Sequence, residues 1–590
     1  MAANLPTATT DNLFAAADLG TNSFKLLIVR ADPTTGRFLP LLYLKEPVVL
    51  GRSISSSSST LSPSSQHRAL AALKKFHHLL LSHSVPPSHT RLVATSALRE
   101  APNRAEFLST VRQTLGLEID VVSGEEEARL VYLGVLQFHP VFNKTVLDID
   151  IGGGSTEFVI GRAGKVLYAN SLKLGHVVLT EEYVRTNEIG KMREHIRRVI
   201  RESGLVEKIG GTGFETVMGS SGTIRAIEEV IYSGYCERLV SDVGFSKGYK
   251  LDWKFRRGEL GKVVGKLCGE RGGVGGKVKI EGFSKRRSEF IVAGAVLLEE
   301  IFGMLGIEEM EVSGYALGEG VIAELLTGVF GDFYLSANLR WSSVVRLAAR
   351  FNDKKRMKSA ALCAGIAKEM FEGVRKWNEV GGSQNKLSCS LDDKDIEYLE
   401  AACLLHNIGV FDGKKGYHKK SCSIIMNSDL QGYDAAEVKI IALLARHHRK
   451  KFPMLDHQSL QGFTKEVKHK FRILCAIIRV SALVKQYLSS NSEVVEFSHS
   501  QEGFKLILSP IGDHSLLPGD DQVLAEDIEA ELTEELEQFR AVTCLTFNPM
   551  LIHMKEITNA HLFKPLMFLS SSGISAEVGH CSFKHFEVIT

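Results

Sequence analysis

The pattern of apolar and polar positions repeats in two segments of the chain. Residues 13–30 begin with an apolar run that ends at Asp18, continue through a Gly-Thr-Asn-Ser turn and close with a second apolar run. Residues 147–161 repeat this order with Asp150, a Gly-Gly-Gly-Ser turn and a second acid, Glu157. Short apolar runs bounded by turn residues are typical of β-strands, so each segment predicts a strand–turn–strand unit.

The two turns carry the residue types that bind phosphate. Glycine has no Cβ, so a phosphate can approach its backbone N–H, and serine and threonine hydroxyls can donate to phosphate oxygens. If the two units face each other, two acids and two turns surround one cleft; a chance pair of β-turns is the alternative. The candidate phosphate-binding residues of the turns are Gly20, Thr21, Asn22, Ser23, Gly152, Gly153, Gly154 and Ser155.

More α/β pattern lies between the two units. The apolar spacing over residues 65–83 predicts an amphipathic helix, and the serine-rich residues 55–59 and 62–65 before it predict a flexible surface insertion. Residues 91–94 predict a short strand. Arg99 follows this strand, where its guanidinium could enter the cleft and grip phosphate oxygens bidentately. A solvated arginine is the alternative.

Two predicted helices begin with residues that suit anion chemistry. Residues 119–135 pass from a strand to a helix that opens with three glutamates, which complement the helix dipole, and any one of which could act as a general base on water. Farther along, a strand, a glycine turn and a helix start follow one another, and helix N-termini bind phosphate. The candidate phosphate-binding residues of this turn are Gly219, Ser220, Ser221, Gly222 and Thr223.

The pattern changes to successive helices from about residue 338. His406 and Asn407 occupy the place of a metal-binding His-Asp pair, but an amide is a poor substitute for a carboxylate at a metal. This region also carries dense basic clusters, which predict either a polyanion site or a solvated face. The cluster residues taken as candidate polyphosphate ligands are His418, Lys419, Arg446, His448, Arg449 and Lys450.

Composition limits the classes of function. The chain has 590 residues, which predicts two to four domains, and its formal net charge of +2 favours neither a nucleic-acid-binding nor a membrane-surface protein. Nine cysteines without a Cys-x-x-Cys pair indicate reduced thiols. Apolar runs such as residues 290–298 are far shorter than the roughly 18 residues of a membrane helix. We therefore expect a cytoplasmic protein that does not enter a membrane or bind nucleic acid.

Five motifs follow one another along the chain: Asp18-Leu-Gly-Thr-Asn-Ser, Thr95-Ser-Ala-Leu-Arg, Ser123-Gly-Glu-Glu-Glu-Ala-Arg, Asp150-Ile-Gly-Gly-Gly-Ser-Thr-Glu and Gly219-Ser-Ser-Gly-Thr. In this order they resemble the exopolyphosphatase/guanosine pentaphosphate phosphohydrolase (Ppx/GppA) family of the actin-like ATPase superfamily. The resemblance implies an α/β fold in which two actin-like (ribonuclease H-like) domains, residues 13–135 and 136–330, surround a cleft. It further implies an all-α HD-like domain at 338–490 and a small α+β appendix at 491–545, whereas residues 546–590 are an extension, expected to be poorly ordered, that the family pattern does not reach.

The resemblance also implies roles for single residues. Glu127 matches the catalytic base, with Glu126 beside it, and Arg99 matches an arginine near the scissile phosphate. Asp150 matches an acid beside Mg²⁺ and the attacking water, and Glu157 matches the acid that closes the same loop. The chain departs from the family where His176 and Val178 replace a small residue and an arginine, where Gly318 replaces a frequent arginine, and where Arg356 or Met357 stands in place of a first HD histidine. We expect His176 to be a packing residue.

The sequence thus predicts a phosphoanhydride hydrolase with Mg²⁺, and K⁺ as a further cation, as cofactors. Asp150, Asp18 and Glu157 are the candidate metal ligands, and Glu127 polarises the attacking water. The predicted substrate is inorganic polyphosphate, with guanosine 5′-triphosphate 3′-diphosphate as the alternative and a homodimer as the expected assembly. A sensor that binds polyphosphate or an alarmone without turnover, and a sugar-kinase-like phosphotransferase, are rival classes.

Overall fold

The computed structural model describes most of the chain and groups it into two compact units. The first unit contains Met1–Ser490 with Leu517–Leu545, and the second contains Asn491–Leu516 with Thr546–Thr590. The described residues are 12–32, 35–50, 60–231, 254–269, 282–331, 339–380, 389–491, 493–500, 503–510, 519–543 and 547–551. The predicted serine insertion at 55–59 and residues 552–590 of the predicted extension lie outside them.

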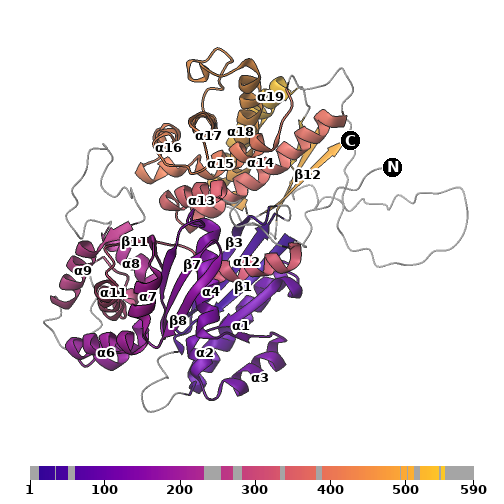
Figure 1. Cartoon of the computed structure of the whole chain (residues 1–590). Helices are drawn as coiled ribbons and strands as arrows, with labels where there is room; N and C mark the ends of the chain where they lie inside the picture. Colours follow the sequence, from indigo (N-terminus) through magenta and orange to yellow (C-terminus); the bar gives the residue numbers. More distant parts are fainter. Residues whose placement is uncertain are drawn as a thin grey trace, which may run out of the picture. The chain divides into compact units, whose positions relative to one another are not determined.

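The first sheet has five strands in the order β3-β2-β1-β4-β5. Strands β3, β2 and β1 form an antiparallel meander. Strand β1 then pairs in parallel with β4, and β4 pairs in parallel with β5. Figure 1 shows this sheet in indigo, with α1, α2 and α3 around it. The elements are β1 (Leu13–Leu19), β2 (Ser23–Ala31), β3 (Phe38–Pro47), β4 (Thr90–Ala94), β5 (Asp120–Val121), α1 (Pro63–Ser82), η3 (Pro87–His89), α2 (Ser96–Glu100) and α3 (Arg104–Leu115).

The serine-rich residues 62–65 are part of the folded structure, so the prediction of a surface insertion is wrong for them. The side chain of Ser62 accepts a hydrogen bond from the Ser65 backbone N–H and caps α1, which begins at Pro63. Ser65 is fully buried. The amphipathic helix that follows is confirmed, and its apolar face packs into the core beneath the first sheet.

The second sheet repeats the arrangement of the first. Its order is β10-β11-β9-β6-β7-β8, in which β6, β7 and β8 form an antiparallel meander and β6 pairs in parallel with β9, as β9 does with β11. The predicted duplication is thus visible as five strands in the same order in both sheets, and β10 adds a sixth strand at the edge of the second. The strands are β6 (Val146–Ile151), β7 (Thr156–Arg162), β8 (Lys165–Leu172), β9 (Thr216–Ser220), β10 (Lys254–Arg256) and β11 (Glu309–Val312).

Helices surround the second sheet, and most of its core residues are aliphatic. Helix α11 contributes a continuous run of buried residues to this core, at positions 291–298. The helices are α5 (His176–Leu179), η4 (Thr180–Val184), α6 (Ile189–Glu202), α7 (Leu205–Thr212), α8 (Gly222–Val230), α9 (Arg257–Gly269), α10 (Lys285–Ser288) and α11 (Ile291–Leu305).

The helical region contains α13 to α18 and also α19. Ion pairs connect it to the α/β part: Lys368 pairs with Asp32 beside the first sheet, and Arg346 pairs with Glu311 of β11 at 2.7 Å. The expected all-α region is therefore confirmed. Its elements are α13 (Leu339–Phe351), α14 (Lys354–Val380), α15 (Asp393–Leu405), η7 (Ile408–Asp412), α16 (Tyr417–Met426), α17 (Ala435–His447), η8 (Gln458–Leu460), α18 (Lys465–Asn491) and α19 (Gly519–Thr543).

The incomplete HD motif lies inside this helical region. Asn352 donates a side-chain hydrogen bond to Asn407 at 3.3 Å, whereas Arg356, one of the two positions predicted for the first histidine, pairs with Asp353. His406 is buried and its Nδ1 is 2.7 Å from the Cys403 carbonyl oxygen. His406 and Asn407 are thus buried and held by hydrogen bonds within the helical region.

The second unit is described only as a three-stranded sheet. Strands β12 (Glu493–Ser500) and β13 (Gly503–Pro510) are antiparallel, and β13 pairs in parallel with β14 (Phe547–Leu551). The first two strands lie in the predicted α+β appendix at 491–545, whereas β14 lies in the predicted extension. Helix α19, expected with these strands, groups with the first unit instead, where Glu535 pairs with Arg479.

Two glycines let helices α4 (Gly124–Phe138) and α12 (Leu317–Phe330) cross backbone against backbone next to β1. A Cβ on Gly320 would overlap the carbonyl oxygen of Leu130, and one on Gly134 would overlap that of Ala316. This close crossing fixes α4, and α4 carries the predicted catalytic glutamate in its first turn.

The crossing predicts opposite effects for two alanine substitutions in α12. Gly320→Ala should lower the free energy of unfolding by at least about 2 kcal/mol, because neither backbone can move away cheaply. Gly328→Ala is the matched control, since a Cβ there meets no atom within 4 Å. It should stabilise the protein by about 0.5 kcal/mol through helix propensity. Thermal unfolding measures both, and equal melting temperatures would contradict the close crossing.

Candidate active site

Each hairpin acid lies in a row of cross-strand neighbours. In the first sheet Asp18 is opposite Lys25, and Lys25 is opposite Lys45; we name these three residues row I. In the second sheet the corresponding row contains Ser220, Asp150, Glu157 and Ser171, which we name row II. Residues directly opposite each other on neighbouring strands present their side chains on the same face. Each row therefore presents its polar groups together.

The structure brings the two predicted turns together. A Cβ on Gly153 would lie 3.0 Å from the Cβ of Thr21, and one on Gly154 would lie 3.0 Å from the Thr21 hydroxyl oxygen. Ser96, which follows Thr95 at the start of α2, is also within contact of Gly154. Only glycines allow this approach. The backbone N–H groups and hydroxyls of both turns thus gather at one place, as the duplicated pattern predicted.

Glu127 is the member of the glutamate run that points into the site. Ser123 caps α4 by accepting a hydrogen bond from the Glu126 backbone N–H at 3.1 Å, which sets the first helical turn. The carboxylate of Glu127 is buried and accepts a 2.9 Å hydrogen bond from the guanidinium of Arg99. Arg99 also donates to the carbonyl oxygen of Val122 at 3.1 Å. The arginine is therefore held in place and holds Glu127 in turn.

Burial raises the pKa of the acids around this point. Burial raises the pKa of Glu127 to about 7, against the opposing charge of Arg99 and with a further increase from Asp18 and Asp150. Burial also raises the pKa of Asp150 to about 6, against the opposing charge of Lys25. The pKa of Glu157 is well above its usual value because of burial and then the charges of Glu127 and Asp150. Four carboxylates thus share one poorly solvated region.

This acid cluster fits a divalent cation that binds few protein ligands. Within the described ranges no group of three or more His, Cys, Asp or Glu side chains is arranged to hold a metal. Mg²⁺, however, usually takes one or two carboxylates and completes its shell with water and substrate phosphate. The raised pKa values of Asp150 and Glu157 show that a positive charge would stabilise their ionised forms. The acids present therefore suit Mg²⁺.

Glu126, the second predicted catalytic glutamate, makes a different set of contacts. Its carboxylate accepts two hydrogen bonds from Arg129, at 2.7 and 2.6 Å, and these hold the pKa of Glu126 below its usual value. Arg129 and Arg91 both pair with Glu324 of α12. Glu126 thus belongs to an ion-pair network that ties α4 to α12, and the structure does not bring it to the acid cluster.

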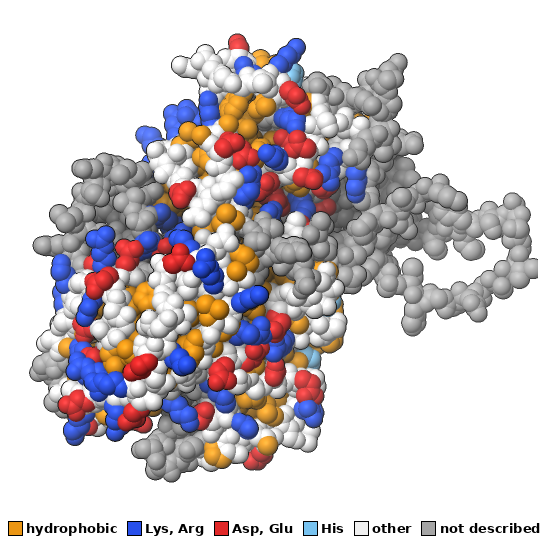
Figure 2. Space-filling model, viewed as in Figure 1, with side chains coloured by type: hydrophobic (Ala, Val, Ile, Leu, Met, Phe, Trp, Pro, Cys, Tyr) orange, Lys and Arg blue, Asp and Glu red, His pale blue; other side chains and the backbone are white. Residues whose placement is uncertain are grey.

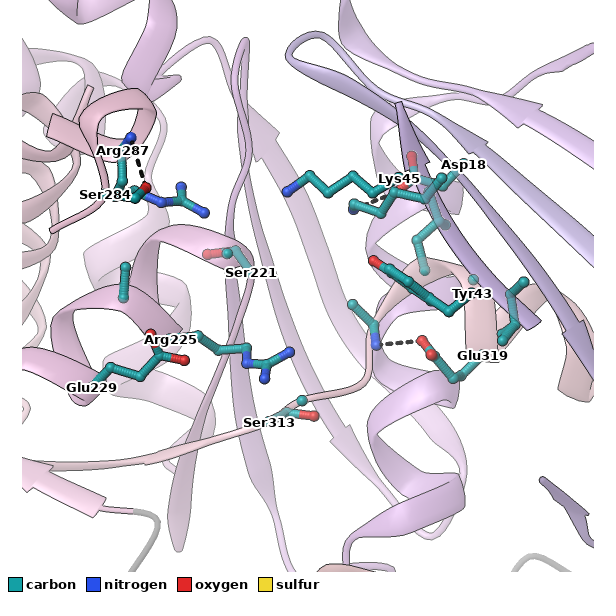
Figure 3. A pocket seen from close by; sticks show the side chains of 18 of the residues that line it. Asp18, Tyr43, Lys45, Ser221, Arg225, Glu229, Ser284, Arg287, Ser313 and Glu319 are labelled. Atoms are coloured by element: carbon teal, nitrogen blue, oxygen red, sulfur yellow. Dashed lines mark hydrogen bonds and ion pairs between the residues drawn. The ribbon is translucent and has the colours of Figure 1, made fainter. Parts of the chain in front are cut away.

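A pocket of about 320 Å³ adjoins row I. Lys45 and Tyr43 line one side, and Arg225 and Arg287 line the other (Figure 3). On the outer face in Figure 2, Lys and Arg lie interspersed with Asp and Glu. Four basic residues, including Lys25, line the pocket together with the acids Asp18, Glu229 and Glu319, and its basic residues can attract a polyanion.

The residues of the third predicted turn, 219–223, do not all lie at the same place. Ser221 and Gly222 line the pocket, and Ser220 lies opposite Asp150 in row II. Thr223 instead contacts the buried His176, with its hydroxyl 3.3 Å from the imidazole Nδ1. The fifth residue, Gly219, packs against Met310. His176 is buried beside Phe290, and burial lowers its pKa to about 3, as expected of a packing residue.

Residues 27–328, just over half of the 590-residue chain, match the Ppx/GppA phosphatase family, and residues 339–531 match domain III of that family. The chain belongs to the Ppx/GppA phosphatase family. It is accordingly a phosphoanhydride hydrolase, and the predicted pair of α/β domains is confirmed together with the helical domain that follows.

Two crystal structures of family members are similar to this chain. An exopolyphosphatase from Cytophaga hutchinsonii is 26% identical, with 54% of this chain and 100% of that chain covered and a TM-score of 0.46. A Ppx/GppA family member from Aquifex aeolicus is 25% identical, with 54% and 98% of the two chains covered and a TM-score of 0.42.

The basic residues of domain III do not all face the surface. His448 is buried, where it shares a 2.9 Å hydrogen bond with the Tyr417 hydroxyl and has its Nδ1 2.7 Å from the Ala445 carbonyl oxygen. Burial lowers the pKa of His418, and so do the charges of Arg449, Lys419, Arg446 and Lys450, which shows that these five predicted ligands cluster.

No described helix is both long and apolar enough to cross a membrane.

The sequence analysis missed the basic residues of the pocket. Lys25, Lys45, Arg225 and Arg287 were not among the candidates. Lys25 had a usable signal, because a hairpin with a short turn fixes the register, and that register places Lys25 opposite Asp18. The other three come from strands and helices whose approach depends on the tertiary fold.

The Arg99–Glu127 contact predicts a measurable shift. In Arg99→Gln the neutral side chain no longer favours the ionised carboxylate, so the pKa of Glu127 should rise above about 7 and the protonated form should persist to higher pH. Infrared spectra recorded as a function of pH follow this titration, and the Glu127→Gln variant identifies the band of the Glu127 carboxyl group. Arg112→Gln, which removes an exposed ion pair with Glu118, is the control and should leave it unchanged. An unshifted titration in Arg99→Gln would contradict the contact.

Proposed function

We propose that the protein is an exopolyphosphatase that removes the terminal orthophosphate from inorganic polyphosphate. The observation that supports this most strongly is the buried Glu127, whose pKa of about 7 makes it an effective base near neutral pH, beside two glycine turns that can receive a phosphate. Family membership supplies the reaction class. The four basic residues of the pocket next to row I support a substrate with several negative charges.

In the proposed reaction Glu127 removes a proton from a water molecule as the water oxygen attacks the terminal phosphorus. The bond between that phosphorus and the bridging oxygen breaks, and the electron pair stays on the shortened chain while orthophosphate leaves. Arg99 orients the carboxylate and favours its ionised form before the attack. The N–H groups and hydroxyls of the two turns neutralise the phosphate oxygens. Positioning and charge neutralisation supply most of the rate in such transfers.

A divalent cation belongs to the proposal through the acids that could hold it. Asp150 is the first candidate ligand, with Glu157 and Asp18 as the others, and bound Mg²⁺ would neutralise phosphate oxygens. Ser171 donates a 2.8 Å hydrogen bond to Glu157 and so fixes that carboxylate in row II. The further predicted cation, K⁺, has no residue assigned to it.

Guanosine 5′-triphosphate 3′-diphosphate is the second candidate substrate, and its terminal 5′-phosphate would be the group removed. Tyr43 favours it, because its aromatic ring lines the pocket, and aromatic rings stack with nucleotide bases. The same two turns would receive the terminal phosphate of either substrate.

Glu127→Gln tests the proposal with the smallest change of shape. Loss of the base should lower kcat for phosphate release by about 100-fold or more, since general-base catalysis contributes about that much. Binding of polyphosphate should persist, because the turns and pocket are intact. Phosphate release is measured with Mg²⁺ on long polyphosphate and on the guanosine nucleotide. Glu125→Gln, an exposed glutamate in the same helical turn, is the matched control and should retain activity.

The outcomes separate the rival functions. Release from polyphosphate alone supports the first candidate, and faster release from the nucleotide supports the second. Full activity in Glu127→Gln would contradict the assigned base. A wild-type protein that binds both compounds and releases phosphate from neither would be a sensor.

A further inference from the structure

The contact between Arg99 and Glu127 depends on one short segment of the chain, residues 120–127. Val122, whose carbonyl oxygen accepts a 3.1 Å hydrogen bond from Arg99, belongs to this segment. Ser123 follows and caps α4, and Glu127 lies in the first turn of that helix. Backbone N–H groups in a first helical turn lack helical partners, so other contacts must hold the turn in place.

Five charged side chains form an ion-pair network around this segment, which we call the Glu324 network. Glu126 accepts two hydrogen bonds from Arg129, and Arg129 also pairs with one oxygen of Glu324. The other oxygen of Glu324 pairs with Arg91 of β4. Arg91 in turn pairs with Asp120 of β5 at 2.6 Å. Negative and positive groups thus alternate from one end of the network to the other.

The two ends of the network lie at the two ends of the segment. Asp120 lies two positions before Val122, and Glu126 directly precedes the proposed base. The shared carboxylate, Glu324, lies on α12 one turn after Gly320, where α12 crosses α4 without room for a Cβ. A close helix crossing therefore holds the carboxylate that holds both arginines, and the arginines hold both ends of the segment.

Geometry and partial burial distinguish this network from ordinary surface ion pairs. A single exposed ion pair contributes little to stability, because water screens it and two side chains lose freedom. Here the side chains of Arg91, Arg129 and Glu324 are only 24%, 33% and 34% exposed. Both oxygens of Glu126 bind one guanidinium, which defines the direction of that carboxylate. The network therefore fixes positions even where it adds little to stability.

The direction of Glu126 determines the direction of Glu127. Successive residues of an α-helix point about 100° apart around its axis. Glu126 faces Arg129 and α12, so Glu127 is turned toward Arg99. A general base must lie within hydrogen-bond reach of its water, and a misplacement of about 1 Å can lower the rate about 100-fold. The rotation of this first turn is thus a property on which the reaction depends.

We propose that Glu324 is a positioning residue of the reaction: by holding Arg91 and Arg129 it fixes residues 120–126, and with them the place of the Glu127 carboxylate beside Arg99. This rests on the proposed function only for the role of Glu127 as the base. It also gives Glu126 a part in the reaction, because Glu126 transmits the position of α12 to the first turn of α4.

Glu324→Gln keeps the size of the side chain and removes the charge that the two arginines share. The kcat for phosphate release from polyphosphate should fall about tenfold while KM stays within about twofold, because the phosphate-binding turns are unchanged. Infrared titration should place the pKa of Glu127 above about 7, since a displaced carboxylate loses the contact with Arg99. Glu118→Gln, which removes an exposed carboxylate paired with Arg112, is the matched control and should behave as the wild type.

These measurements distinguish positioning from a structural role. A Glu324→Gln protein that melts at a lower temperature but keeps wild-type kcat and an unshifted Glu127 titration would overturn the proposal. If Glu324→Gln does not fold, Asp120→Asn removes the far end of the network, and wild-type kcat and titration in that variant would overturn it equally. The titration needs no substrate, so full activity in Glu127→Gln would refute the proposed base and still leave the positioning result interpretable.

Discussion

The burial of several carboxylates around one point is the constraint on which the site depends. Ionised carboxylates are costly to remove from water unless cations or hydrogen bonds compensate them. Arg99 compensates Glu127, and Lys25 compensates Asp18 and also favours the ionised form of Asp150, whereas Glu157 accepts a hydrogen bond from the Ser171 hydroxyl. The pKa values of Asp150 and Glu157 are raised because burial is not fully compensated by positive charge. The site is therefore prepared for added positive charge and for a base that works near neutral pH.

The rest of the first unit holds these groups in place. Helix α4 presents Glu127, and its close crossing with α12 leaves little freedom to shift along the helix axis. The Arg129–Glu324 ion pair adds a polar tie between the same helices. Domain III contacts both sheets, through Lys368 with Asp32 and Arg346 with Glu311. A movement of one sheet against the other would therefore also strain the contacts of domain III.

Sequence reasoning recovered the parts of the site that local pattern encodes. The strand–turn–strand repeats were predictable because apolar runs, glycines and the acids recur at fixed spacing. Glu127 could not be separated from Glu126 by local pattern, because only the packing of α4 decides which face meets Arg99 and which meets Arg129. The family resemblance pointed to Glu127, and the structure shows why that face is the buried one.

Other residues were beyond local reasoning or were misjudged. Arg225 and Arg287 share a pocket with Lys45 only because the tertiary fold brings helices α8 and α10 opposite the first sheet. Ser65 was taken for surface because serine-rich runs usually are, yet here the run caps and begins a helix. His448 was counted with an exposed basic cluster, but helix packing buries its ring beside Tyr417. In each case the tertiary environment overrode composition.

The origin of the oxygen in the released phosphate tests the central claim most directly. Wild-type protein would be given inorganic polyphosphate in ¹⁸O-labelled water, and the products separated and analysed by mass spectrometry. Attack of water on the terminal phosphorus places one labelled oxygen in each released orthophosphate and none in the remaining chain. Label found in the new end of the remaining chain, or orthophosphate released without label, would contradict terminal attack by a water molecule that Glu127 activates.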